Sequence, residues 1–228
     1  MELRKSNIPG LIIVVGLLSL FFPASCWADT VAAPFSYSSA SANGQSVFIM
    51  LAPVTLDTDA TGQRKEIRDE ALRIRAKYQV SGLYRNDGST TPLWTVDWYA
   101  HSVFVFSDGN HLVREGPWAT SSSDEALTFF SSGKEIRSYK IKDLEDLPWL
   151  LPHTVSHFRW LKTADVNDSD RTLTVVTFLW DKYVFDAATG GIVSSRRPTR
   201  LALGALALIV VIAVLLLLKR ARRRDVVA

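Results

Sequence analysis

The sequence predicts a mainly β fold of antiparallel hairpins, followed by one transmembrane helix near the carboxyl end. Short aliphatic and aromatic runs recur along the middle of the chain, and turns that contain glycine separate many of them. The only cysteine is Cys26, so the residues after it must fold by core packing without disulfides. The residues from Leu201 to Leu218 are apolar throughout, and cations follow them at once. These three observations define a β domain tethered to a membrane.

Residues Met1 to Ala28 have the pattern of a secretory signal peptide. A basic start precedes the apolar run Leu11 to Phe22, and small residues lead up to Asp29. We expect cleavage between Ala28 and Asp29. Two alternatives stay open, namely retention of the segment as an anchor and lipid attachment at Cys26.

The exported β domain is expected to extend over residues 44–195, after a loosely ordered lead-in at 29–43. Residues 46–51 predict a first strand. Residues 72–80 alternate between apolar and polar side chains, which predicts a half-buried strand. The same stretch also offers apolar residues at helical spacing, so a short helix over 63–72 that runs into a strand is an open alternative: these residues are Ile67, Ala71, Ile74 and Tyr78.

Four pairs of apolar runs predict β-hairpins, because each pair encloses a short turn of residues that tolerate positive φ. The pairs are Val80–Tyr84 with Leu93–Tyr99, Val103–Phe106 with His111–Arg114, Leu127–Phe130 with Glu135–Ile141, and Tyr183–Asp186 with Gly191–Ser194. Residues 156–161 and 172–179 predict two further strands, and 143–152 predicts a connector or a turn of helix.

The recurring hairpins resemble the blades of β-propeller proteins over residues 43–194 at most. Blades of about 40–45 residues would fit only three or four times, so we expect a two-sheet sandwich, a curled meander or a partial propeller-like arrangement rather than a closed ring. The stretches GLYRNDGSTTPLWTVDWYA (82–100) and YVFDAATGGIV (183–193) also resemble a group of uncharacterised exported bacterial proteins. That resemblance implies no particular activity.

The apolar run Leu201–Leu218 would span about 27 Å as a helix, close to the hydrocarbon thickness of a bilayer. We therefore expect the lipid bilayer as a partner, with a juxtamembrane linker at 196–200 and a cytoplasmic tail at 219–228. The positive-inside rule predicts this orientation, with the β domain outside. The cations of the tail are Lys219, Arg220, Arg222, Arg223 and Arg224.

The basic character of the whole chain comes from its two ends. The sequence pI is about 9.0, but seven of the 26 Lys and Arg residues lie before Asp29 or after Arg200, which leaves 19 against 21 acidic residues in between. The domain is thus mildly acidic. A nucleic-acid partner, which needs clustered cations, is excluded.

Candidate catalytic residues are Asp97, His101 and His111, which could serve a hydrolase as general acid and base. No nucleophile elbow or phosphate-binding glycine loop occurs in the chain. His153 and His157 are four residues apart, but Pro152 precedes them and the surrounding residues favour strand. We therefore expect no metal site and no cofactor.

Six tryptophans lie between residues 94 and 180, and most are expected in the core. Trp118 and Trp149 are the candidate binding residues, because an exposed indole can stack on a sugar ring. The sequence as a whole predicts a binding or envelope-interaction module, with envelope proteins or polysaccharide as partners. The alternative is a membrane-tethered hydrolase that acts on extracellular polymer. The oligomeric state is not predicted.

Overall fold

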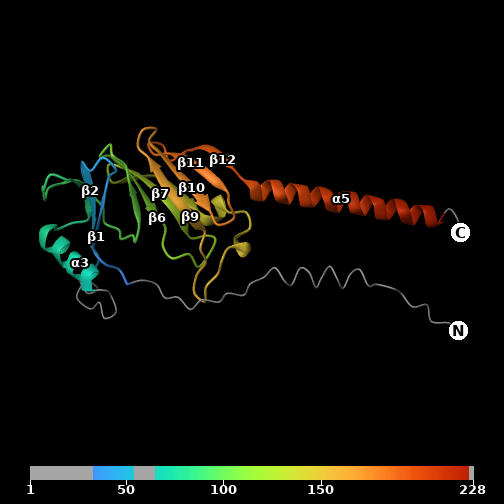
Figure 1. The fold of residues 1–228 in the computed structure, drawn as a ribbon, viewed down its shortest axis with the longest axis horizontal. Coiled ribbons are helices and arrows are strands. Elements are labelled where there is room, and N and C mark those ends of the chain that lie inside the picture. Colours follow the sequence, from blue (N-terminus) through green and yellow to red (C-terminus); the bar gives the residue numbers. More distant parts are fainter. Residues whose placement is uncertain (1–32, 54–64, 226–228) are drawn as a thin grey trace.

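The computed structural model describes residues 33–53 and 65–225 (Figure 1). The predicted signal peptide lies outside these ranges. The described residues are mainly β, with three antiparallel four-stranded sheets and one long apolar helix at the carboxyl end. Each sheet is a meander, in which consecutive strands are neighbours, and we number the sheets I to III in chain order.

Sheet I consists of β1 (Tyr37–Ala40), β2 (Ser46–Met50), β3 (Gly82–Arg85) and β4 (Pro92–Thr95). Sheet II consists of β5 (Val103–Val105), β6 (His111–Glu115), β7 (Glu125–Ser131) and β8 (Lys134–Lys140). Sheet III consists of β9 (Leu161–Asn167), β10 (Thr172–Thr177), β11 (Lys182–Asp186) and β12 (Ile192–Arg196). The helical elements are α3 (Lys65–Lys77), α4 (Ile141–Leu144), η1 (Pro148–Leu150) and α5 (Pro198–Asp225).

The sheets pack face to face as successive layers, with α3 at one end and α5 projecting from the other (Figure 1). Strand β2 shows why the layers form: Val47 and Ile49 face α3, whereas Phe48 and Met50 face sheet II. Because successive side chains of a strand point to opposite faces, a continuous apolar run is buried on both faces. Sheet II is the middle layer, and its β7 is buried along five successive residues.

Sheet III is buried on one face only. Strand β10 alternates between partly buried and buried residues, and its buried Leu173 and Val175 face sheet II. Since α3 covers sheet I and the outward-facing residues of β10 in sheet III are only partly buried, the described layers form an open stack. The fold thus has one sheet more than a sandwich, and its blade-like sheets do not close into a ring.

The strand directions give the stack two distinct edges. The short hairpin turns all lie at one edge, which we call the turn edge. There the Asp168 carboxylate accepts a hydrogen bond from the Ser107 amide at 2.8 Å, and the Asn43 amide donates to the Ser107 hydroxyl at 3.2 Å. These bonds tie the three sheets together. The longer connections and the start of α5 lie at the opposite edge, which we call the loop edge.

The four predicted hairpins are confirmed by the strand pairing. The β7–β8 hairpin has a two-residue turn, Ser132-Gly133, with both φ angles positive, at 49° and 78°. This geometry matches the right-handed twist of the flanking strands and strongly favours glycine.

Three predictions of local structure were wrong. Residues 72–80 do not form a strand, because α3 continues to Lys77, with Ala71 and Ile74 buried and Ile74 packed against sheet I. The helical spacing, rather than the alternation, describes this segment. The lead-in 29–43 contains β1, whose polar sequence carries only a weak β signal. The strand expected at 156–161 begins instead at Leu161, as β9, and extends to Asn167.

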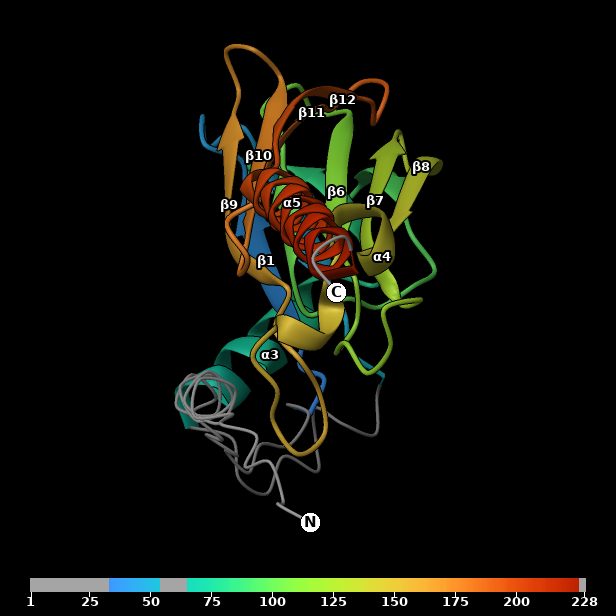
Figure 2. The same ribbon diagram turned by 90° about the vertical axis from the view of Figure 1, so that its right-hand side faces the viewer.

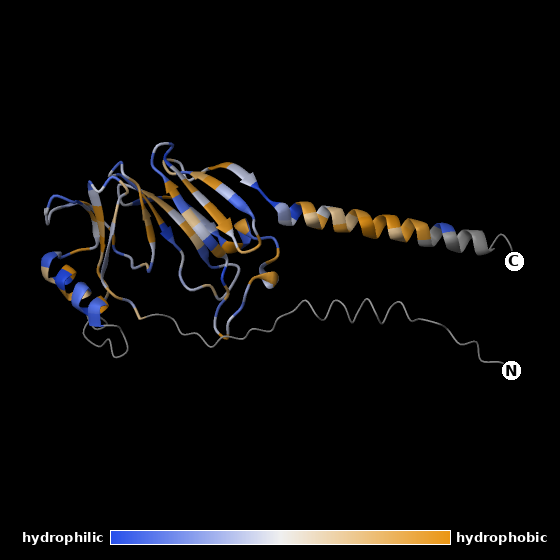
Figure 3. Ribbon diagram, in the orientation of Figure 1, coloured by the Kyte–Doolittle hydropathy of each residue, from blue (hydrophilic) through white to orange (hydrophobic). Residues whose placement is uncertain are grey.

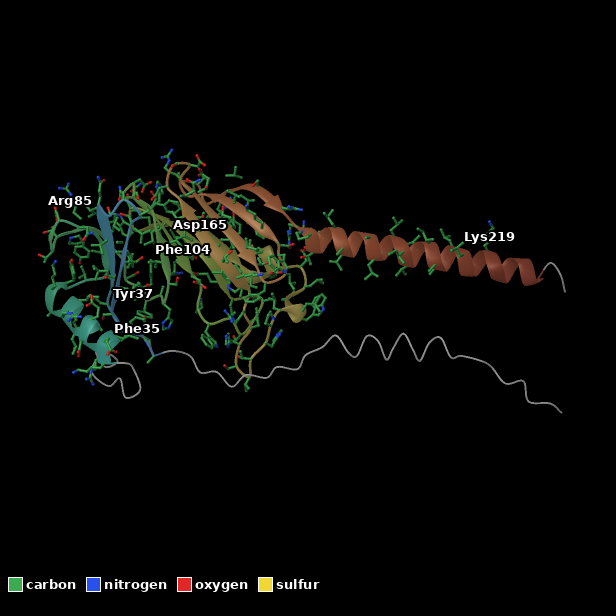
Figure 4. All side chains as sticks on the ribbon, viewed as in Figure 1. Phe35, Tyr37, Arg85, Phe104, Asp165 and Lys219 are labelled. Carbon is green, nitrogen blue, oxygen red and sulfur yellow. The ribbon has the colours of Figure 1, made fainter. Side chains whose placement is uncertain are left out.

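Helix α5 continues directly from the domain, so residues 196–200 are not a separate linker. Arg196 ends β12 and Pro198 begins the helix. Residues Pro198–Leu216 are long and apolar enough to cross a membrane, and none of this window is buried against the domain. The helix is apolar on all sides from Leu201 to Leu216, and Lys219 lies far from the sheets (Figures 3 and 4).

Candidate functional site

A pocket of about 410 Å³ opens at the loop edge. Its walls come from four segments that are distant in sequence, namely the start of β1, the connection into β5, the loop after β6 and the loop before β9. The volume lies in the range of small-molecule sites. We call it the Trp118 pocket, and the side chains that give it chemical character are Phe35, His101, Glu115, Trp118, His157 and Arg159.

Close packing of β6 against β7 shapes the pocket floor at Gly116. The Gly116 amide donates a hydrogen bond to the Ala126 carbonyl at 2.8 Å, and a Cβ at position 116 would lie 1.8 Å from the Glu125 carbonyl oxygen. Only glycine therefore fits here. Pro117 follows and turns the chain away, which places Trp118 over the pocket.

Trp118 packs against His157, with ring centroids 3.6 Å apart and ring planes 40° apart. A short turn holds His157 in place, because the Thr154 hydroxyl lies 2.6 Å from its Nδ1 and the Thr154 amide donates to its carbonyl. The Trp118 indole N–H is buried, and no atom of the described residues accepts a hydrogen bond from it. A buried donor without an acceptor is costly.

Two titratable side chains of the pocket have displaced pKa values. Burial raises the pKa of Glu115, and a hydrogen bond from the Ser102 hydroxyl partly offsets this effect. Burial lowers the pKa of His101. The pKa of the carboxyl and the pKa of the imidazole therefore move toward each other.

The amino-terminal segment completes the wall on the side of sheet I (Figure 4). The Phe35 amide donates to the Tyr99 hydroxyl at 3.1 Å, and the Tyr37 hydroxyl donates to the Ala100 carbonyl at 3.0 Å. Burial raises the pKa of Tyr37, and the charges of Tyr99 and Glu115 add to this effect. These bonds position the connection that carries His101.

The structure does not bring the three candidate catalytic residues together. His101 lines the Trp118 pocket, whereas His111 lies at the turn edge, at the other end of a five-residue strand, about 13 Å away by strand rise. There its Nδ1 lies 2.6 Å from the Asp108 carboxylate. Asp97 is exposed, on the face opposite to that of its core-packing neighbours Val96 and Trp98.

The candidate binding residues lie in different surroundings. Trp118 lines the pocket, while Trp149 is 68% exposed on η1. Trp160 is buried, and Trp94 and Trp98 pack against the core between sheets I and II. Trp180, which was expected in the core with most tryptophans, is instead 64% exposed.

Glu115, His157 and Arg159 were missed as pocket residues. Glu115 ends a strand in ordinary β context, and His157 was considered only as a partner of His153. Only the packing of the loops shows that these side chains meet. Among residues 33–53 and 65–225, no group of three or more His, Cys, Asp or Glu is arranged to hold a metal ion.

No known protein-family model matches the sequence, and no curated protein is significantly similar to it.

Proposed function

We propose that this chain is a single-pass membrane protein whose β domain lies outside the cytoplasm and binds an envelope ligand in the Trp118 pocket. The apolar α5 is the anchor, from Leu201 to Leu218, and the cations from Lys219 onward remain on the cytoplasmic side. The signal pattern before Asp29 supports translocation of the amino end.

The unpaired Trp118 indole N–H is the observation that carries the binding function. It is a buried donor on an aromatic ring, in a pocket that also contains a carboxyl, an imidazole and an arginine. This combination suits a ligand with an apolar ring face and several hydroxyl or amide groups, such as the sugar of an envelope polysaccharide.

Titration calorimetry with chito-oligosaccharides, used as soluble N-acetylated sugar chains, tests this proposal. Trp118→Phe keeps a ring but removes the N–H, so we expect affinity to fall about tenfold, the equivalent of one buried hydrogen bond. Trp118→Ala should abolish binding. Trp149→Phe is the matched control, since it changes an exposed indole outside the pocket, and it should leave affinity unchanged. Binding that survives Trp118→Ala would refute the assignment.

Hydrolysis of such a polymer is the second candidate function. The observation that favours it is the presence of Glu115 and His101 in one pocket, with pKa values displaced in opposite directions. Release of reducing ends by the wild-type chain, lost in Glu115→Gln and retained in Glu135→Gln on the exposed β8, would establish it. Binding without release would leave the domain a binding module.

A further inference from the structure

Two large aromatic side chains are exposed on the part of the domain from which α5 emerges. Trp149 on η1 is 68% exposed, and Trp180 in the turn between β10 and β11 is 64% exposed. Leu150, beside Trp149, is 46% exposed. Tryptophan is usually among the most buried residues, so two such side chains near one helix need a physical reason.

Hydrogen bonds hold both tryptophans next to the first turn of α5. Arg200, in that turn, donates to the Asp146 carboxylate at 2.8 Å and 3.2 Å, and Trp149 follows Asp146 by three residues. The Thr199 hydroxyl donates to Asp181, the neighbour of Trp180, at 2.7 Å. Figure 2 looks from the side to which α5 projects and shows this helix in front of sheet III.

Three exposed cations, Lys162, Lys182 and Arg196, lie near these tryptophans. Lys182 and Arg196 are direct cross-strand partners in sheet III, although like charges that face each other destabilise a sheet in water. The Lys162 ammonium lies 2.9 Å from the centroid of the Trp180 ring. All three side chains are exposed, and within the described part of the chain none of them forms an ion pair.

From this arrangement we propose that the surface formed by Trp149, Leu150, Trp180, Lys162, Lys182 and Arg196 rests on the lipid headgroups around α5. The partner of this surface is the bilayer that contains α5. Arg200 is bonded to the domain and Leu201 follows it directly, so no linker separates the domain from the apolar span. Indoles concentrate at membrane interfaces, and clustered cations favour anionic headgroups. This inference rests on the proposed membrane anchoring.

Site-specific labelling of the full mature chain tests the docking. A polarity-sensitive fluorophore is attached to Trp149→Cys, Trp180→Cys or Leu93→Cys, in vesicles of phosphatidylcholine with phosphatidylglycerol. Leu93 is the control, because it is 44% exposed but lies on β4 in sheet I, the sheet farthest from α5 (Figure 1). We expect a blue shift and quenching by headgroup-level spin-labelled lipid at positions 149 and 180, and neither effect at position 93.

The outcomes separate docking from anchoring. If the chain floats with the vesicles but positions 149 and 180 are quenched no more than position 93, the docking surface is refuted and the anchor stands. If the chain does not float, both proposals fail. A blue shift that is the same in detergent and in vesicles, without quenching by lipid, would indicate a second protein copy on this surface and would also overturn the inference.

Discussion

Glu145 is the most unusual single residue of the domain. It is 1% exposed, and neither carboxyl oxygen has a hydrogen bond of normal geometry. Its pKa is raised to about 7, mainly by burial and also by the nearby charge of Asp181, while Thr177 and Arg197 partly offset the shift. A carboxyl that stays protonated in the folded state makes stability depend on pH.

We predict that Glu145 destabilises the fold as the pH rises. The folded state holds this proton up to about pH 7, whereas the unfolded chain loses it near the ordinary value of 4.5. The contribution of Glu145 to the free energy of unfolding is therefore fully present below its pKa in the unfolded chain. It declines as the pH rises from there and is lost once the pH passes the pKa of Glu145 in the folded state. Glu145→Gln should not show this decline. Its free energy of unfolding relative to the wild type should therefore increase by about 3 kcal/mol as the pH rises from about 5 to about 8.

Denaturant unfolding in detergent at both pH values measures this difference. Glu135→Gln is the control, since Glu135 is exposed on β8. An equal effect of pH on the wild type and on Glu145→Gln would contradict the prediction.

At the scale of elements, the first turn of α5 is part of the domain. Asp181 is completely buried, and one of its oxygens accepts hydrogen bonds from the amide and the hydroxyl of Thr199, at 3.2 Å and 2.7 Å. A carboxylate at the start of a helix satisfies unpaired amides and interacts favourably with the helix dipole. The Arg197 guanidinium lies 2.8 Å from Asp146 and 3.5 Å from Asp181.

We predict that Asp181→Asn loosens this junction. It keeps the shape of the side chain but leaves the partly buried Arg197 without one of its two carboxylate neighbours, at a cost of about 3 kcal/mol. Amide hydrogen exchange should accelerate at residues 199–201, at the base of α5. Asp165→Asn, at an exposed position of β9, should change neither stability nor exchange. Unchanged exchange at the base of α5 would show that Asp181 does not hold the helix.

Elements were predictable where one local signal dominated. Turns with glycine predicted the hairpins, because positive φ is a local requirement. Residues 72–77 carried two periodicities at once, and the neighbouring sheet decided between them, since Ile74 and Ala71 could be buried together only on a helix. Strand β9 was misplaced because its polar side chains lie on the exposed face of sheet III, where alternation is weak.

At the scale of the whole molecule, the open stack places the turn edge and the loop edge at opposite sides. The Trp118 pocket and the base of α5 both belong to the loop edge. A ligand in the pocket would therefore be held on the edge of the domain from which the anchor starts.

We predict that the two ends of α5 lie on opposite sides of the membrane. In a Cys26→Ser background, Lys134→Cys on β8 should react with a membrane-impermeant maleimide in intact cells. Ala221→Cys, in the basic tail, should react only after permeabilisation. Labelling of Ala221→Cys in intact cells, or protection of Lys134→Cys from the reagent, would contradict the predicted orientation.

The sequence alone determined the features that depend on neighbouring residues, namely the hairpins, the glycine turns and the apolar α5. Only the tertiary structure decided which loops meet. Trp118 and His157 are 39 positions apart, and Glu145 and Arg197 are 52 apart, yet each pair is brought together at the loop edge. Such meetings depend on how the sheets stack, because the burial of whole faces stabilises the fold and the loops follow the strands that carry them.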